Sequence, residues 1–236
     1  MKLNSLFKTF TKTDFLLWFS SIGVIVVSFC IFDRKGFLAL AASLLGTTSL
    51  IFCAKGDPLG QLIMIVFSGI YGYISFVFSY YGEMLTYLGM TAPMALISLI
   101  SWVRNPFHGE SSEVRVNTIP PVEIMLIPFM TAAVTFVFYF ILKHFHTSNL
   151  LPSTISVATS FAAAYLTFRR SAFFALAYAL NDIVLIILWS MAAMQDISYL
   201  SVLICFAMFL INDIYGFISW QKMKKRQRQN YSNPIN

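Results

Sequence analysis

Hydrophobic residues in this chain are gathered into eight long blocks, separated by short stretches that contain charges, proline or glycine. Each block is close to the roughly 20 residues that a helix needs to cross the hydrocarbon core of a bilayer. Barrel strands are excluded because the blocks lack strict alternation, and in hydrocarbon a backbone amide otherwise finds its partner only within a helix. We therefore predict membrane-spanning helices at residues 14–32, 36–54, 59–81, 84–103, 123–142, 152–168, 171–194 and 198–220.

The composition agrees with a protein whose main surroundings are lipid and other helices. Apolar residues make up 58% of the chain and charged residues only 11%, whereas soluble domains carry about 25% charged residues. The cysteines Cys30, Cys53 and Cys205 lie inside apolar blocks without metal-ligand spacing, so we interpret them as packing residues. The first block lacks a small-residue cleavage site and is predicted to remain as a span.

The distribution of basic residues predicts the orientation of the chain. Thirteen of the 16 Lys and Arg residues fall in the termini or in connections on one side, and only Arg34, Lys35 and Lys143 fall on the other. Basic connections stay in the cytoplasm, so both termini are predicted to be cytoplasmic. The cations of the last stretch are explained by topology and anionic lipid headgroups, and we expect no nucleic acid partner.

Two parts of the sequence look alike. Leu-Ile-Ser-Trp at 99–102, which closes the fourth block, is echoed by Phe-Ile-Ser-Trp at 217–220, which closes the eighth. The Thr-Thr-Ser patch at 47–49 in the second block has a counterpart at Thr159 and Ser160 in the sixth. Four spans separate those two blocks, so both copies cross in the same direction, which predicts a parallel repeat. The predicted division is 1–35 for the cytoplasmic N-terminus and an extra helix, 36–103 for the first three-helix repeat, 104–151 for a cytoplasmic loop and linker helix, 152–221 for the second three-helix repeat, and 222–236 for a basic cytoplasmic tail.

Polar groups inside the spans are the main candidates for function. The chain has no phosphate-binding glycine loop, no paired His and Glu at metal spacing and no Gly-x-Ser-x-Gly elbow, so we expect no enzyme, metal or cofactor. Asp182 follows Asn181 in the seventh block, and Asp213 follows Asn212 in the eighth. A carboxylate inside the membrane is costly, so each aspartate either orders the bundle through a hydrogen bond or faces a solute. We favour the solute for Asp182 and leave both readings open for Asp213.

Aromatic residues provide the second candidate feature. Tyr178 precedes Asp182 by one helical turn, so ring and carboxylate share a face. With Tyr71, this pairing suits a neutral or cationic aromatic solute that stacks on rings. Hydroxyl groups for the same solute are expected from Ser68, Thr159 and Ser160. Trp102 and Trp220 each adjoin a cytoplasmic cation, which suits interface anchors or gates. The predicted gate consists of Trp102, Trp220, Asp213 and Asn212.

With these residues in view, the chain resembles the PnuC family of vitamin transporters, best known for nicotinamide riboside, from about residue 36 to residue 226. The likeness is carried by Tyr-Gly-Tyr-Ile-Ser-Phe at 71–76, Tyr-Gly-Glu at 81–83, Pro93 with Met94, Trp102, Asp182, and Gly-Phe at 216–217 with Trp220. The resemblance implies an all-α integral membrane fold, with two three-helix repeats around a linker helix, related to the SWEET sugar transporters, and an extra N-terminal helix.

The resemblance also implies a function. It implies facilitated diffusion of nicotinamide riboside, or a related nucleoside-like vitamin precursor, across a bacterial cell membrane by alternating access. A cytoplasmic kinase traps the solute, and the transporter is often a homotrimer.

Several positions depart from the family pattern. They are Phe67 or Ser68, where the family has Asn; Tyr87, where it has Asn; Ala95, where it has Gln or Asn; and Tyr178, where it has Trp. Such positions choose the solute, so a transporter for thiamine, riboflavin or a deoxynucleoside stays open. A membrane scaffold or an enzyme subunit without a pore is the alternative from another class.

Overall fold

The computed structural model describes residues 10–77, 81–107, 113–147 and 149–232. Within these residues, eight helical segments are long and apolar enough to cross a membrane, which confirms the predicted number of spans. They are α2 (Lys12–Phe32), α3 (Phe37–Ala54), α4 (Leu59–Val77), the combined α5 (Tyr81–Thr86), η1 (Tyr87–Thr91) and α6 (Ala92–Val103), α7 (Pro121–His144), α8 (Leu150–Phe168), α9 (Phe174–Ala193) and α10 (Leu200–Ser232), which follows the short turn η2 (Ile197–Tyr199). Residues 78–80, at the end of the third predicted span, lie outside the described residues.

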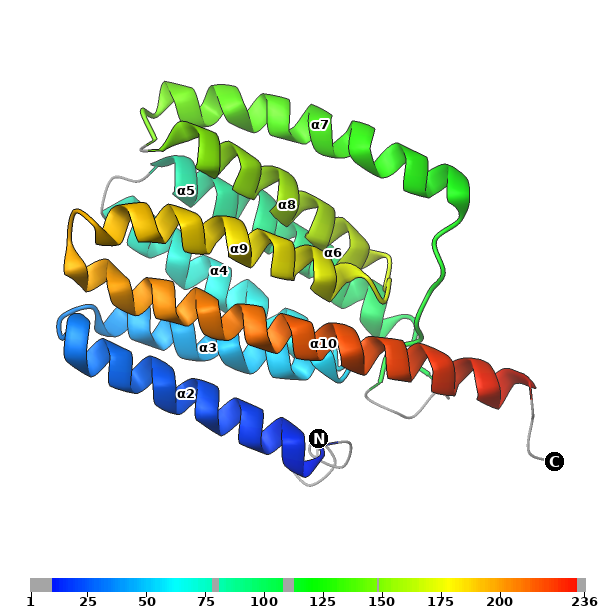
Figure 1. Cartoon of the computed structure of the whole chain (residues 1–236). Helices are drawn as coiled ribbons and strands as arrows, with labels where there is room; N and C mark the ends of the chain where they lie inside the picture. Colours follow the sequence, from blue (N-terminus) through cyan, green and yellow to red (C-terminus); the bar gives the residue numbers. More distant parts are fainter. Residues whose placement is uncertain (1–9, 78–80, 108–112, 148, 233–236) are drawn as a thin grey trace.

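The helices form one bundle with α2 and α7 at opposite edges (Figure 1). In chain order, α3 packs on α4 and α4 on α6, and in the same way α8 packs on α9 and α9 on α10. The two groups meet through α6 against α8 and through α10 against α3. Both ends of the described chain and the connection before α7 lie at one end of the bundle (Figure 1). Each group therefore contacts the other through its first and last helices.

Equivalent hydrogen bonds join the two groups at this end. At the end of α6, the indole Nε1 of Trp102 donates to the carbonyl oxygen of Thr167 at 2.9 Å. The neighbouring hydroxyl of Ser101 donates to the carbonyl oxygen of Phe168, also at 2.9 Å. Both acceptors belong to the last turn of α8, whose carbonyls have no partners within their own helix. Thr167 O also accepts from Arg170 N in the turn that follows, so the indole adds a second donor there, and the two side-chain bonds fix α6 against α8.

The same pattern recurs in α10, near the end of its membrane-spanning part. Trp220 Nε1 donates to the carbonyl oxygen of Cys53 at 2.8 Å, and Ser219 Oγ donates to that of Ala54 at 2.7 Å. The rings of Trp102 and Trp220 are both fully buried, with centroids 5.3 Å apart. We call the bonds made by Ser101, Trp102, Ser219 and Trp220 the Ser–Trp latch.

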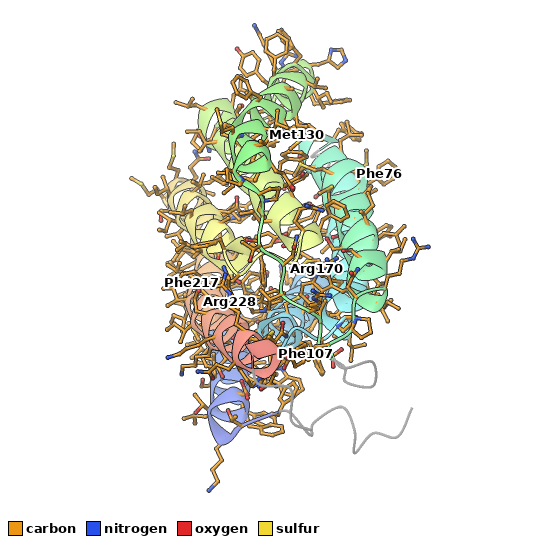
Figure 2. All side chains as sticks on the ribbon, turned by 90° about the vertical axis from the view of Figure 1, so that its right-hand side faces the viewer. Phe76, Phe107, Met130, Arg170, Phe217 and Arg228 are labelled. Carbon is orange, nitrogen blue, oxygen red and sulfur yellow. The ribbon has the colours of Figure 1, made fainter. Side chains whose placement is uncertain are left out.

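The turns after α3 and α8 also match each other. Gly56 has φ +68° and Arg170 has φ +55°, both in the left-handed region. Glycine adopts this conformation readily, whereas an arginine there is uncommon. The side chain of Arg170 donates to Ser101 Oγ at 2.7 Å, which ties the second turn to the latch, and Arg170 lies near the middle of this end of the bundle (Figure 2). Val114 N and Asn117 N donate to the carbonyl oxygens of Gly56 and Arg170, so one connection holds both turns.

The last helix extends beyond the predicted end of its span at residue 220 to Ser232. Its extension is held by the connection between α6 and α7. Gln227 Nε2 donates to Glu113 Oε1 at 2.8 Å and to the carbonyl oxygen of Val114 at 3.0 Å, and Arg226 pairs with Glu113. The basic tail is therefore helical as far as Ser232.

A buried polar junction attaches α2 to the bundle. Asp14 is fully buried and accepts hydrogen bonds from Lys55 Nζ at 2.8 Å and from the hydroxyl of Tyr215. Thr11 and Asp14 also form a capping box, which satisfies free amides of the first turn. The junction joins α2 to the turn after α3 and to α10.

We expect Trp102→Phe and Trp220→Phe each to lower the free energy of unfolding by about 1 kcal/mol, because each removes one buried hydrogen bond but keeps an aromatic ring. Thermal unfolding in detergent measures the effect. Trp189→Phe is the matched control, because the Trp189 indole makes packing contacts but no hydrogen bond among the described residues. An equal loss of stability in Trp189→Phe would show that the hydrogen bonds of the latch do not account for the effect.

We expect Asp14→Asn to destabilise the protein by about 3–5 kcal/mol, because it leaves the Lys55 ammonium beside a neutral partner in a largely buried site. Tyr215→Phe removes one hydrogen bond and should cost about 1 kcal/mol. Unfolding measurements on both variants test whether Asp14→Asn is the more destabilising change. A smaller loss for Asp14→Asn than for Tyr215→Phe would show that the ion pair does not hold α2.

Candidate functional site

A cavity of about 130 Å³ lies between the two groups of helices. Both groups line it, because α3, α4, α5 and η1 contribute from one side and α8, α9 and α10 from the other. Its lining residues include Gly46, Phe67, Glu83, Tyr87, Ser156, Ser160, Tyr178, Asn181, Asp182, Trp189, Phe206, Phe209 and Asp213. A cavity shared by the two groups changes shape whenever they move relative to each other.

Asn181 forms the polar wall of the cavity together with α8. Its side-chain oxygen Oδ1 accepts hydrogen bonds from Thr159 Oγ1 at 2.7 Å, from Ser160 Oγ at 3.0 Å and from Ser156 Oγ at 3.4 Å. Because these hydroxyls engage the oxygen, the side-chain nitrogen Nδ2 is the part of the amide left for a solute. It is a donor suited to a hydroxyl or carbonyl oxygen.

Asp182 and Asp213 place two carboxyl groups on the same cavity. Each residue is only 4% exposed, and the two come from neighbouring helices, α9 and α10, that both line the cavity. Glu83 adds a third acid from α5. Among the described residues, no three His, Cys, Asp or Glu side chains are grouped to hold a metal ion. The cavity therefore carries three carboxyl groups among largely apolar walls.

Aromatic rings form much of the remaining wall. Tyr87 lies in η1, a π-helical segment that ends just before Pro93, which has no amide hydrogen to continue a regular helix. Such widened turns often occur at functional sites. Tyr87 packs on Tyr71, with ring centroids 4.7 Å apart. The π segment therefore brings a tyrosine from the middle of the fourth span to the cavity.

A close approach of α3 completes this wall. A Cβ atom added at Gly46 would lie 2.5 Å from Phe209 Cζ and 3.3 Å from Phe67 Cε2. Only glycine leaves room for both rings at this point.

The structure brings part of the predicted site together. Asp182, Asn181, Tyr178, Ser160 and Asp213 line the cavity.

The other predicted residues lie behind the lining or elsewhere. Tyr71 supports Tyr87 and Phe67 from behind, and Thr159 holds Asn181. Ser68 Oγ donates to the carbonyl oxygen of Met64 in its own helix.

Of the four predicted gate residues, Asp213 lines the cavity and the other three do not. Asn212 Nδ2 donates to Ser21 Oγ of α2 at 2.9 Å and so faces the extra helix. Trp102 and Trp220 lie in the latch. Their role as a gate stays a prediction.

Several lining residues were missed by the sequence reasoning. Glu83 precedes the predicted start of the fourth helix at residue 84, but α5 begins at Tyr81 and carries the acid into the cavity. Tyr87 and Phe67 also line the cavity and were not among the predicted site residues. Tyr87, and Phe67 or Ser68, are positions at which the chain departs from the family pattern. Those departures were the available signal for the site.

Comparisons with known proteins agree with this fold. A nicotinamide riboside transporter, PnuC, from Neisseria mucosa is 26% identical over 222 residues, which are 92% of this chain and 83% of that protein. The crystal structure of the vitamin B3 transporter PnuC superposes with a TM-score of 0.81, at 24% identity, and the match covers 96% of this chain and 100% of that one. At 24% identity, the likeness to this crystal structure shows a shared fold.

The resemblance to the PnuC family is confirmed by a family model. The model of the nicotinamide mononucleotide transporter family matches residues 36–222. The match begins just before α3 and leaves out α2. Because the match spans most of the chain, this protein belongs to the nicotinamide mononucleotide transporter family of multi-pass membrane transporters.

Proposed function

We propose that this chain carries nicotinamide riboside, or a closely related nucleoside-like vitamin precursor, across a bacterial cell membrane by facilitated diffusion. The observation that carries the proposal is the cavity, which combines aromatic rings, an oriented amide and carboxyl groups. Tyr87 and Tyr178 offer faces for a flat ring. Asn181 and Ser160 offer polar groups for ribose hydroxyls or a carboxamide. The name of the Neisseria mucosa relative supports the same substrate.

The transport step in this proposal is alternating access. Residues 36–103 and 152–221 act as two three-helix repeats, joined by the loop and linker helix at 104–151. The equivalent Ser–Trp bonds support this division, because the third helix of each unit bonds the first helix of the other. Parallel repeats that rock around a central site are a common transporter design. The latch would close the cavity at the end that carries both termini.

The proposal also includes the orientation of the protein in the membrane, its coupling to a kinase and its assembly. The basic residues favour cytoplasmic termini, which places the latch at the cytoplasmic side. Facilitated diffusion needs a sink, and phosphorylation by a cytoplasmic kinase would trap the solute. The long apolar face of α7, which includes the exposed Phe129 and Phe136, supports contact with lipid or with other subunits of a homotrimer.

We expect purified protein in liposomes to take up labelled nicotinamide riboside down its gradient, whereas protein-free liposomes do not. Unlabelled nicotinamide riboside should compete, and thiamine, riboflavin and deoxynucleosides should compete less. Stronger competition by one of those three compounds would reassign the substrate within the transporter class. Absence of uptake for every compound would favour the scaffold alternative.

We expect Asn181→Ala and Ser160→Ala to weaken nicotinamide riboside binding, about tenfold for the asparagine, which corresponds to about 1.4 kcal/mol. The first change removes the free amide donor, and the second removes one hydroxyl that orients it. Thr154→Ala is the matched control on the same helix, because its hydroxyl donates to Leu150 O and does not line the cavity. Equal losses in all three variants, by calorimetry in detergent, would remove Asn181 from the site.

A further inference from the structure

A second hollow lies at the end of the bundle that carries both termini. It has a volume of about 300 Å³ and is lined by Asn105, Arg115, Val116, Asn117, Thr118 and Arg170. None of these residues lines the cavity between the two groups of helices. Two of them are arginines, and the described residues of the lining include no acid. We call this feature the basic hollow.

The ion pairs at this end of the bundle use cations outside the basic hollow. Glu113, in the connection, pairs with Arg226 of α10. Glu123, at the start of α7, pairs with Arg169, whose Nη2 donates to Glu123 Oε2 at 2.7 Å. Arg170 itself forms no ion pair among the described residues, so its positive charge is available to an anion in the hollow.

The guanidinium group of Arg170 is already held in place. Its Nε donates to the carbonyl oxygen of Arg115 at 3.2 Å, and its Nη1 donates to Ser101 Oγ at 2.7 Å. The third nitrogen, Nη2, has no acceptor among the residues that the structure describes. Burial, with the like charges of Arg169 and Arg115, lowers the pKa of Arg170. An anion would relieve this repulsion and would find a donor group that is oriented before it binds.

The backbone of Arg170 indicates that its side chain has a role of its own. Arg170 adopts the left-handed conformation with φ +55°, whereas the matching turn after α3 has a glycine, Gly56, with φ +68°. A side chain strains the backbone in this conformation and glycine does not. Strain of this kind is often found at functional sites. The second turn therefore carries an arginine where a glycine would fold more easily.

The chemistry of the lining suits a phosphate group. Guanidinium groups bind phosphate oxygens through parallel N–H donors, and the side chains of Asn117 and Thr118 add neutral donors. Lipid headgroups surround the rim of a membrane protein, whereas Arg170 lies near the middle of this end of the bundle (Figure 2). The position therefore favours a free anion over a lipid.

We propose that the basic hollow binds a free phosphate-bearing anion through Arg115 and Arg170, and that the bound anion holds the Ser–Trp latch closed. The second part follows because Arg170 bonds both the connection and Ser101 of the latch. An anion that fixes Arg170 stabilises the arrangement in which the two groups of helices are joined. It opposes their separation at this end, so its effect on transport rests on the proposed function.

Calorimetry with inorganic phosphate in detergent tests the site on the full chain. Chloride keeps the ionic strength constant, because salt screens the general attraction of exposed cations for anions. We expect one phosphate to bind per chain, about tenfold more weakly in Arg115→Gln and not at all in Arg170→Gln. Arg104→Gln is the matched control, because Arg104 is exposed at the same end but does not line the hollow. Absence of binding to wild-type protein, or equal weakening in Arg104→Gln, overturns the site.

The source of the phosphate group is tested in nanodiscs. Phosphate should bind equally well whether the nanodiscs contain phosphatidylcholine alone or also phosphatidylglycerol. Loss of phosphate binding in the presence of phosphatidylglycerol would show that a lipid headgroup occupies the hollow, which contradicts a free anion.

Hydrogen exchange tests the effect on the latch without reference to any solute. Phosphate should slow exchange of the backbone amides at the end of α6 and in the turn after α8 in wild-type protein, but not in Arg170→Gln. If Arg170→Gln does not fold, Arg115→Gln gives the same comparison at a phosphate concentration that fills only the wild-type site. Unchanged exchange in wild-type protein that binds phosphate overturns this part.

Uptake by liposomes links the site to transport. Phosphate should slow the uptake of labelled nicotinamide riboside by wild-type protein more than by Arg115→Gln, and equal slowing in both contradicts the link. A protein that binds phosphate but carries no nicotinamide riboside contradicts the proposed function and leaves the anion site standing.

Discussion

The hydrogen-bonding demand of the polypeptide backbone in lipid is the constraint on which this structure depends. Carbonyl groups in the last turn of a helix lack partners within their own helix, and hydrocarbon supplies none. The Ser–Trp latch meets this demand at α3 and α8 with donors from α10 and α6. Thr167 O and Cys53 O also accept from Arg170 N and Gly56 N in the turns that follow, so each latch indole is a second donor that comes from the other group of helices. The latch joins the two groups at one end of the bundle, and the cavity lies between the same two groups.

The cavity follows the same rule with side chains. Asn181 is tolerated inside the membrane because three hydroxyls of α8 engage its oxygen. Those hydroxyls have the backbone of their own helix as alternative partners, so they can turn toward the asparagine at little cost. Asp182 is different, because no described donor reaches its Oδ2 atom.

Much of the fold follows from the sequence, since each span must supply about 20 apolar residues and the eight blocks show them directly. The site was partly predictable for a related reason: Asp182 and Asn181 stand out in an apolar block. Trp102 was read as an interface anchor or a gate because a cation follows it. In the sequence, a tryptophan next to a cation looks the same whether its indole faces lipid headgroups or the end of another helix. Only the folded structure distinguishes these two cases. Tyr87 was outside the predicted site because its place depends on the π-helical turn before Pro93.

The buried junction at Asp14 has a consequence for how the protein is made. Thr11 and Asp14 leave the ribosome first, Lys55 follows after the next helix, and Tyr215 belongs to the last one. The aspartate therefore acquires its final partner only when synthesis is almost complete. Until Lys55 is made, the charge of Asp14 lacks its ion-pair partner, and until Tyr215 is made, the carboxylate lacks one of its hydrogen bonds. Insertion of the first helix and its final docking are thus separate events, set apart by the synthesis of nearly the whole chain.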